Sequence, residues 1–384
     1  MIQPAERTKS LGASVFTEMA RHKKKAASKG KDMIDLSVGS PDLPPPSGVR
    51  SILSEETLEK DNYGYALQGL EAFNEAASGY CSERFNISLD SSEVLQLLGS
   101  QDGLSHLALA YLNPEDYIII PDPGYPIYSA CADLAGAYTY PVSLNEENQF
   151  MPDITAVPSH VLERTKILIM NYPGNPASAR ATKDYFEKVV ALALEHSILI
   201  VHDFAYAELD FTEDKPLSIF HIDGAKETAL EFHSLSKSFN MAGARIGFVT
   251  GREDLLKPLA DIKSNIDYGV FYPVQKAAIH ALTYEQPFLS TQKQTFRNRR
   301  DVFCQSLHEK GWHVTIPDGG MFVWAKLPPS YTSMGFALKA LEAGVVVTPG
   351  HAFGLEGEGY VRIALVQEEE RLKEAANRLA SIIF

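Results

Sequence analysis

The stretch "EFHSLSKSFNMAGARIG" (residues 231–247) places a lysine among small hydroxyl residues and an arginine eight positions after it. The lysine follows an apolar, strand-like run. A lysine flanked by Ser236 and Ser238 is a poor packing residue, because a buried ammonium group needs a partner for its charge. It is well suited to form a covalent bond beside a phosphate. Whether such a site exists depends on what the other strands bring to the same place.

The middle of the chain repeats one pattern: a short apolar run, a turn rich in Gly, Pro and Asn, and then a helical stretch. The pattern recurs in "DYIIIPDPGYP" (116–126), "KILIMNYPGNP" (166–176), "SILIVHDFAY" (197–206) and "LEFHSLSKSF" (230–239). Short β-branched runs bounded in this way predict buried strands of a mainly parallel sheet with helices on both faces. The apolar spacing over 101–111 and 182–195 predicts two of these helices. The fold class is therefore α/β, and ligands of such sheets bind beyond the carboxyl ends of the strands.

The pattern changes after about residue 280. A long polar helix is predicted over 287–310, with strands at 313–316, 321–325, 345–348 and 360–365 and helices at 334–343 and 367–382. This α+β pattern indicates a smaller second domain, and the length of 384 residues also favours two domains. We expect a large domain over 31–280 and a small domain formed by 1–30 and 281–384.

The composition limits the classes of partner. The formal net charge of −14 argues against nucleic acid, because a phosphate backbone attracts a positive surface. One basic run, "RHKKKAASKGK" (21–31), is interpreted as the solvated face of an N-terminal helix rather than as a binding patch. No run reaches the about 18 apolar residues that a membrane span requires, and the N-terminus has no apolar signal core. We therefore expect a soluble intracellular protein.

The cysteines point to the same compartment. Cys81, Cys131 and Cys304 are odd in number, far apart and without the spacing of metal ligands. They are interpreted as buried free thiols in a reducing compartment, the cytoplasm. No metal site is expected.

Polar residues follow the predicted strands. Asp203 comes after the apolar run 198–201, so its carboxylate is expected at a strand end, where a plain helix cap is the alternative. Tyr206 follows closely. The turn "NYPGNP" (171–176) prevents regular structure, and "LGSQDG" (98–103) can direct backbone N–H groups at a phosphate. Each signal alone is weak, but their order along the chain is specific.

This order resembles that of the pyridoxal-phosphate-dependent aminotransferases of fold type I, classes I and II. The resemblance extends from "LSVGSPD", which contains Gly39, to "EGYVRIAL", which contains Arg362. Its most specific stretch is "SLSKSFNMAGARIGF" (234–248). The resemblance implies a large domain with a mainly parallel sheet between helices, plus a smaller α+β domain.

The resemblance also implies the roles of individual residues. Lys237 would be the Schiff-base lysine and the base that moves the substrate proton, and Asp203 would pair with the protonated pyridine nitrogen. Asn175 and Tyr206 would hydrogen-bond the 3′ oxygen of the cofactor ring, and Tyr125 would stack on the ring. The phosphate would be held by Ser100, Gln101, Ser234, Ser236 and Arg245. The substrate α-carboxylate would be received by Gly39 and Arg362, beside Asn175.

Two further implications concern the subunits and the phosphate. In this family a tyrosine of the neighbouring subunit reaches the phosphate, and the sequence offers both Tyr63 and Tyr65 for that position. A homodimer with shared active sites is therefore expected. Gln101 stands where close relatives often carry lysine, so one phosphate contact would be neutral.

The expected function is amino-group transfer between an α-amino acid and a 2-oxo acid. The stretches "VHDFAYAEL" and "PDPGYPIY" are most similar to the branch with LL-diaminopimelate, methionine and alanine or glutamate-type aminotransferases. A carbon–sulfur β-lyase with the same cofactor is the alternative, because fold does not fix the reaction. A cofactor-binding domain of a transcriptional regulator is disfavoured, because we expect no room for a DNA-binding module before Gly39.

Overall fold

The computed structural model describes residues 2–5, 7–11, 15–27, 30–67 and 69–383. Most of the basic run at 21–31 lies on helix α2 (Val15–Ala27), where Arg21, Lys24 and Lys25 are exposed, as expected for a solvated helix face. Residues 28 and 29 of that run lie outside the described residues.

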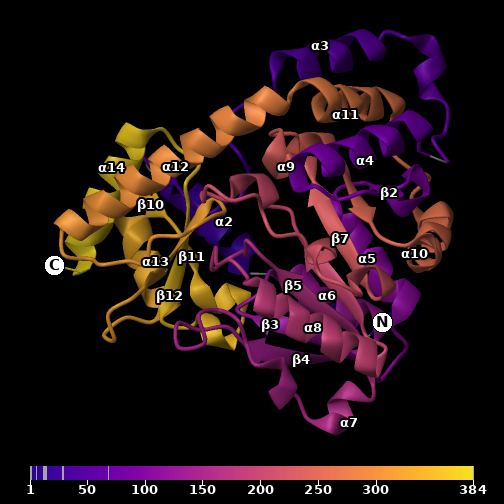
Figure 1. Ribbon diagram of the computed structural model, residues 1–384. Helices are drawn as coiled ribbons and strands as arrows, with labels where there is room; N and C mark the ends of the chain where they lie inside the picture. The colour runs from indigo at the N-terminus through magenta and orange to yellow at the C-terminus, as the bar shows by residue number, and fades with distance from the viewer. Residues whose placement is uncertain (1, 6, 12–14, 28–29, 68, 384) are drawn as a thin grey trace.

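A seven-stranded sheet forms the centre of the larger part of the molecule (Figure 1). Its strand order is β2-β8-β7-β6-β5-β3-β4. The neighbouring pairs from β7 to β4 are parallel. At the other edge, β8 is antiparallel to both of its neighbours, β7 and β2. The bounds are β2 Val94–Leu97, β3 Tyr117–Asp122, β4 Tyr138–Ser143, β5 Thr165–Asn171, β6 Leu199–Asp203, β7 Ala229–Ser234 and β8 Gly247–Thr250. The mainly parallel sheet predicted from the four apolar runs is confirmed.

Helices cover both faces of this sheet, which explains why its central strands carry apolar residues on both faces. Ile118 and Ile120 pack with the helices α5 (Ser100–Tyr111), α6 (Ile127–Ala135) and α10 (Glu253–Ile266). Ile119, between them, points to the other face and packs with α8 (Lys183–His196). Side chains of a strand alternate in this way, and this alternation determines which residues reach the cavity.

Three further helices lie near the sheet edge with β2 and β8. They are α3 (Ser47–Glu56), α4 (Glu71–Phe85) and α11 (Tyr272–Tyr284), which pack against one another. Short helices occupy Arg7–Ser10 (α1), Ser159–Leu162 (α7) and Leu235–Ser238 (α9). The last of these follows β7 directly and carries Lys237.

The C-terminal part has its own core. A three-stranded antiparallel sheet of order β11-β12-β9 packs with α12 (Gln286–Glu309), α13 (Ser333–Glu342) and α14 (Glu369–Ile383). Its strands are β9 Phe322–Lys326, β11 Thr348–Pro349 and β12 Tyr360–Ala364. Figure 1 shows α12 running from this part toward α11.

Residues just before the cavity segment join this second core. The strand β1 (Ile34–Asp35) pairs with β10 (Val345–Val346), and Leu36 is buried among the same apolar side chains. We expected the large domain to begin at residue 31. This pairing places residues 34–36 with the C-terminal part instead, because their partner strand lies there.

The strand expected at 313–316 is absent. Its backbone meets a side chain instead of a neighbouring strand: His308 Nε2 lies 2.9 Å from Val314 O and 3.2 Å from Val314 N, and it can bond either group according to its tautomer. The apolar Val314 and Trp312 that produced the strand-like pattern pack into the C-terminal core. Burial without a partner strand therefore accounts for the wrong prediction.

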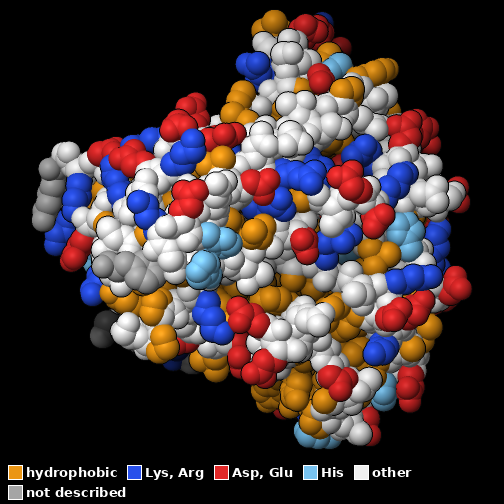
Figure 2. Space-filling model, turned by 60° about the vertical axis from the view of Figure 1, so that its left-hand side comes forward, with side chains coloured by type: hydrophobic (Ala, Val, Ile, Leu, Met, Phe, Trp, Pro, Cys, Tyr) orange, Lys and Arg blue, Asp and Glu red, His pale blue; other side chains and the backbone are white. Residues whose placement is uncertain are grey.

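Charged side chains of both signs occur on the surface. On the face drawn in Figure 2, basic and acidic side chains are interspersed. None of the described helices has the length and apolar character that a membrane crossing requires.

Candidate active site

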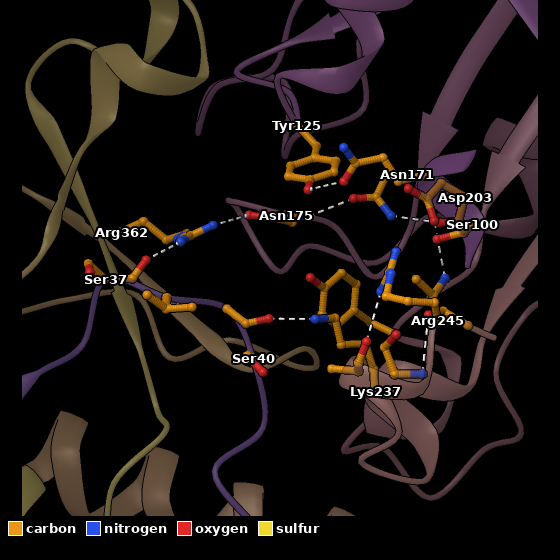
Figure 3. Close-up of a pocket in the computed structure, with 18 residues that line it drawn as sticks. Ser37, Ser40, Ser100, Tyr125, Asn171, Asn175, Asp203, Lys237, Arg245 and Arg362 are labelled. Carbon is orange, nitrogen blue, oxygen red and sulfur yellow. Dashed lines mark hydrogen bonds between the residues drawn. The ribbon is translucent and has the colours of Figure 1, made fainter. Parts of the chain in front are cut away.

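A cavity of about 400 Å³ lies where strands of the large sheet end against the C-terminal part (Figure 3). It is lined by Ser37, Val38, Gly39, Ser40, Ser100, Gln101, Tyr125, Asn171, Asn175, Asp203, Ala205, Tyr206, Ser234, Ser236, Lys237, Ala242, Arg245 and Arg362. The two ends of the cavity carry different side chains. Figure 3 shows Arg362 and Ser37 at one end and Asp203, Ser100 and Arg245 at the other.

Lys237 reaches the cavity from the short helix α9. Its ammonium group donates a hydrogen bond to the backbone oxygen of Gly39. Burial lowers the pKa of Lys237 to about 8, and the charges of Arg362 and Arg245 add to this effect. A lysine with this pKa is partly neutral near pH 8, and only a neutral amine has the lone pair that attacks an aldehyde.

Asp203 ends β6 and points into the same cavity. Tyr128, from α6, is fully buried and donates from its hydroxyl to Asp203 Oδ2 over 2.7 Å. Ala205 N donates to Oδ1 over 3.3 Å. Burial raises the pKa of Asp203, while the hydrogen bonds from Tyr128 and Ala205 oppose that shift. The site thus contains a desolvated carboxylate that is ready to pair with a cation.

Two asparagines with different contacts lie at the end of β5 and in the turn that follows it. Asn171 donates from Nδ2 to the backbone oxygen of Asp203 over 2.6 Å, and its Oδ1 accepts from Asn175 N over 2.7 Å. The Asn175–Pro176 peptide bond is cis. The Asn175 side chain lies in the cavity, where it interacts with the Tyr206 hydroxyl.

The start of α5 and Arg245 form one end of the cavity. Gly99 has a φ of +82°, a left-handed conformation that favours glycine, and a Cβ atom there would lie 2.7 Å from Arg245 Nη2, so Arg245 would have to shift. Ser100 begins a helix of 12 residues, whose first N–H groups have no partner within the helix. Together with the guanidinium of Arg245, these groups are suited to bind a phosphate.

Arg362 lies on β12 at the other end, where it is 2% exposed. Its Nη1 donates to Asn175 Oδ1 over 3.0 Å, and its Nη2 donates to the backbone oxygen of Ser37 over 2.6 Å. The guanidinium lies 4.4 Å from the ring centre of Phe322 and 4.7 Å from that of Phe353. Burial lowers the pKa of Arg362 to about 10, so the group stays charged at neutral pH. These contacts hold a planar cation in a fixed orientation.

The structure brings most of the predicted site residues together. Gly39, Ser100, Gln101, Tyr125, Asn175, Asp203, Tyr206, Ser234, Ser236, Lys237, Arg245 and Arg362 all line the cavity. Tyr125 donates from its hydroxyl to Gln101 Oε1 over 2.9 Å, which adds a contact that the sequence did not suggest. Tyr63 and Tyr65 lie outside the lining and are exposed, with 64% and 79% of their surface accessible.

Among the residues that sequence reasoning missed are Asn171 and Tyr128, which both bond to Asp203. Asn171 ends the apolar run of β5, in the same way as Asp203 ends that of β6, and that position was a usable signal. Tyr128 lies three residues after Tyr125, a spacing that places both on one side of a helix start. Its bond to Asp203 depended on how α6 packs on the sheet and could not be derived from spacing.

The cofactor implied by the resemblance fits these residues. Pyridoxal phosphate has an aldehyde, a basic ring nitrogen and a phosphate, and the cavity offers a lysine of lowered pKa, a buried carboxylate and a cationic helix start. Glycine at position 99 lets the backbone come close to a bound phosphate, because it has no side chain in the way.

Comparisons with known proteins agree with this geometry. A family model for aminotransferase class I and II matches residues 31–379. An LL-diaminopimelate aminotransferase of Syntrophobacter fumaroxidans is 41% identical over 383 residues, covering 99% of each chain. Among solved structures, substrate-bound BacF from Bacillus subtilis has a TM-score of 0.96 at 33% identity and covers 100% of this chain and 98% of its own.

A second solved structure with a similar fold was determined with maleate. The aspartate aminotransferase from Thermus thermophilus with maleate has a TM-score of 0.92 at 28% identity and full coverage of both chains. The fold is thus that of the type I pyridoxal-phosphate enzymes. The chain belongs to the class I and II aminotransferases and is a pyridoxal-phosphate-dependent aminotransferase.

Proposed function

We propose that the chain transfers the amino group of an α-amino acid to a 2-oxo acid at the cavity around Lys237. The observation that carries this proposal is the convergence of Lys237, Asp203, Arg245 and Arg362, from distant parts of the sequence, on one cavity. Pyridoxal phosphate supplies an electron sink for the charge left when the substrate loses its α-proton. The remaining chemistry belongs to the protein side chains.

Lys237 and Asp203 have different roles in the proposed reaction. Lys237 would hold the cofactor through its amine and would move the substrate proton as a neutral amine, which its lowered pKa favours. Asp203 would pair with the ring nitrogen and favour its protonated form, because a carboxylate stabilises an adjacent cation. Asn175 and Tyr206 would hydrogen-bond the ring oxygen, and Tyr125 would stack on the ring.

The two ends of the cavity bind the two anionic groups. Ser100, Gln101, Ser234, Ser236 and Arg245 hold the phosphate at the α5 end. At the other end, Arg362 and the backbone of Gly39 receive the substrate carboxylate. A guanidinium can bind a carboxylate through two parallel hydrogen bonds. A Cβ atom at position 39 would lie 2.7 Å from the Phe322 ring. The backbone can therefore lie this close to Phe322, and to a bound carboxylate, only if residue 39 is glycine.

The amino donor is proposed to be of the diaminopimelate type, with 2-oxoglutarate and glutamate as the partner pair. Support comes from the LL-diaminopimelate aminotransferases that match nearly the whole chain at about 40% identity, including those of Syntrophobacter fumaroxidans and Moorella thermoacetica. Methionine, aspartate and alanine-type donors are the comparison set.

The active enzyme is proposed to be a homodimer to which Tyr65 contributes. The Tyr63 hydroxyl already donates to its own chain, to the backbone oxygen of Thr57 over 2.7 Å. Among the described residues, none accepts a hydrogen bond from the Tyr65 hydroxyl, whose ring meets only the edge of Tyr268 at 5.5 Å. Tyr65 is therefore the better candidate to reach the phosphate of the partner subunit.

Two further proposals concern organisation and location. We propose a large domain around the seven-stranded sheet, and a small domain made of the C-terminal part and the N-terminal segment that pairs with it through β1. A cytoplasmic location is supported by the state of Cys81, Cys131 and Cys304, all of which are buried free thiols.

The test is a panel of amino donors assayed with 2-oxoglutarate, including LL-diaminopimelate, methionine, aspartate and alanine. We expect glutamate formation in step with loss of the donor, and the highest kcat/KM with LL-diaminopimelate. Release of pyruvate and ammonia without any acceptor would contradict transamination and indicate a β-lyase. Transfer from every donor except LL-diaminopimelate would overturn only the substrate assignment.

A further inference from the structure

A second polar cluster lies behind the cavity, on the opposite face of the large sheet. It consists of His202, Glu231 and His233, of which the first two have no exposed surface and the third is 4% exposed. His202 and Glu231 are paired neighbours on β6 and β7. Because side chains alternate along a strand, these residues face away from the cavity that Asp203 enters.

The ring of His202 has an acceptor at each nitrogen. Nε2 lies 3.1 Å from the backbone oxygen of Tyr172, and Nδ1 lies 2.9 Å from Glu231 Oε2. A carbonyl oxygen can only accept, so Nε2 carries a hydrogen. The protonation of Nδ1 then depends on whether Glu231 Oε2 is an acceptor.

Glu231 Oε2 is an acceptor for two other donors. Ser218 Oγ lies 2.7 Å from it and Ile219 N lies 3.0 Å from it. The serine oxygen itself accepts from Phe220 N over 3.1 Å, which leaves its hydrogen for Glu231. Burial alone would raise the pKa of Glu231, but the hydrogen bonds from His202 and His233 hold it well below its usual range. A hydrogen on Nδ1 therefore fits this set of contacts, because Glu231 Oε2 already accepts from two other donors.

This ring bonds to segments that deliver three different groups to the cavity. Tyr172 lies in the turn between β5 and Asn175, His202 itself directly precedes Asp203, and Glu231 lies on the strand that leads to Lys237. We propose that His202 is a positioning residue: its doubly protonated ring ties the ends of β5, β6 and β7 together and so fixes the groups that meet the cofactor.

The positive charge of the His202 ring also supports the cavity, because it favours the ionised form of Asp203. Asp203 is desolvated, and burial raises its pKa, while the neighbouring positive charge of His202 favours the carboxylate form. The rings of Phe186 and Phe204 lie 5.1 and 4.6 Å from that of His202 and keep it from moving. His202 thus acts through Asp203 and Asn175 without touching the cofactor, and the inference rests on the proposed roles of those two residues.

The first test compares three variants by their affinity for pyridoxal phosphate, titrated into the apoprotein. H202F removes both donors and the charge, whereas H202Q keeps two N–H groups on one nitrogen without the charge. H233F is the matched control. It removes the other histidine beside Glu231, and it leaves the contacts of His202 with Glu231 and Tyr172 in place. We expect the Kd to rise at least tenfold more in H202F than in H233F, with H202Q between wild type and H202F.

Thermal unfolding of the three apoproteins separates this effect from a loss of fold. Equal Kd values in H202F and H233F, at similar Tm, would overturn the proposal. So would an H202Q variant that binds no better than H202F. If H202F fails to fold, the comparison of H202Q with H233F still decides.

The second test is independent of the catalytic assignments. In the ¹⁵N NMR spectrum of the wild-type holoenzyme, we expect two slowly exchanging ring N–H signals from His202, absent in H202Q. A single N–H signal, with the other ring nitrogen unprotonated, would refute the imidazolium even if transamination by this enzyme were fully confirmed.

Discussion

Tyr128 donates its hydroxyl hydrogen to Asp203 Oδ2 over 2.7 Å, and both side chains are buried. A hydrogen bond to a charged group contributes about 1.5–3 kcal/mol. We therefore expect Y128F to reduce kcat/KM by about ten- to a hundredfold, because Asp203 becomes harder to keep ionised. Steady-state kinetics over a pH series provides the measurement.

Tyr80 offers a matched control for this substitution. It is also buried, and it donates to a carboxylate, Glu208 Oε1, over 2.6 Å, but it does not line the cavity. We expect Y80F to lower the Tm by an amount similar to that of Y128F and to change kcat/KM by only a few-fold. Equal kinetic losses in the two variants would show that the effect is general destabilisation.

Lys237→Ala should abolish covalent attachment of the cofactor. The purified variant is expected to lack the visible absorption band of the wild type and nearly all turnover. Reduction of the wild type with borohydride, followed by peptide mass spectrometry, should place the cofactor on the peptide with residue 237.

Lys263→Ala is the corresponding control, because Lys263 is also a buried lysine. It is 6% exposed and pairs with Asp102 and Asp267 at 2.9 and 2.7 Å. This variant should lose stability and keep the attached cofactor. A cofactor that remains attached in K237A would assign the role to another lysine.

The pKa of Lys237 predicts how attachment depends on pH. Burial, together with Arg362 and Arg245, lowers that pKa to about 8, so the amine loses its proton as the pH rises through this value. Only the neutral form reacts with the aldehyde. The rate of cofactor attachment to the apoprotein should therefore rise with pH up to about 8 and level off above it. A rate that still increases beyond pH 9.5 would indicate an ordinary exposed lysine.

Arg362→Lys should reduce efficiency toward all amino-acid substrates by the same factor. A lysine cannot form the two parallel bonds of a guanidinium, and loss of two bonds of about 1.5–3 kcal/mol each corresponds to about two to four orders of magnitude. Cofactor affinity should stay close to that of wild type. Amines without a carboxylate should be almost unaffected, and loss of one amino acid alone would show that Arg362 binds the substrate side chain.

Tyr65→Phe should weaken cofactor binding by about tenfold, whereas Y63F should have a smaller effect, because the Tyr63 hydroxyl is bound within its own chain. Sedimentation under assay conditions should find a dimer in both variants. A fully active monomer would contradict the shared site.

Much of the fold could be predicted because the parallel strands are buried on both faces. Their apolar runs are continuous, and the polar residues that end them, such as Asp203, stand out. The strand expected at 313–316 failed because apolar residues can be buried without a partner strand, and in this case the ring of His308 bonds the backbone.

The candidate site was predictable where a residue type and its position in a strand or turn were enough, as for Lys237 and Arg362. It was not predictable where the role depends on packing between elements. Tyr128 meets Asp203 only because α6 lies across the sheet, and His202 meets Glu231 only because β6 and β7 are neighbours in a given register. The proposed choice of Tyr65 over Tyr63 likewise rests on side-chain contacts.

The cavity is closed by contacts between residues that are far apart in the sequence. Arg362 bonds to the backbone of Ser37 across 325 positions, and Lys237 bonds to Gly39 across 198. Contacts of such separation require the closure of long loops, which slows folding. The sheet can therefore form before the cavity does, and recovery of cofactor attachment during refolding should lag behind recovery of the helical circular-dichroism signal.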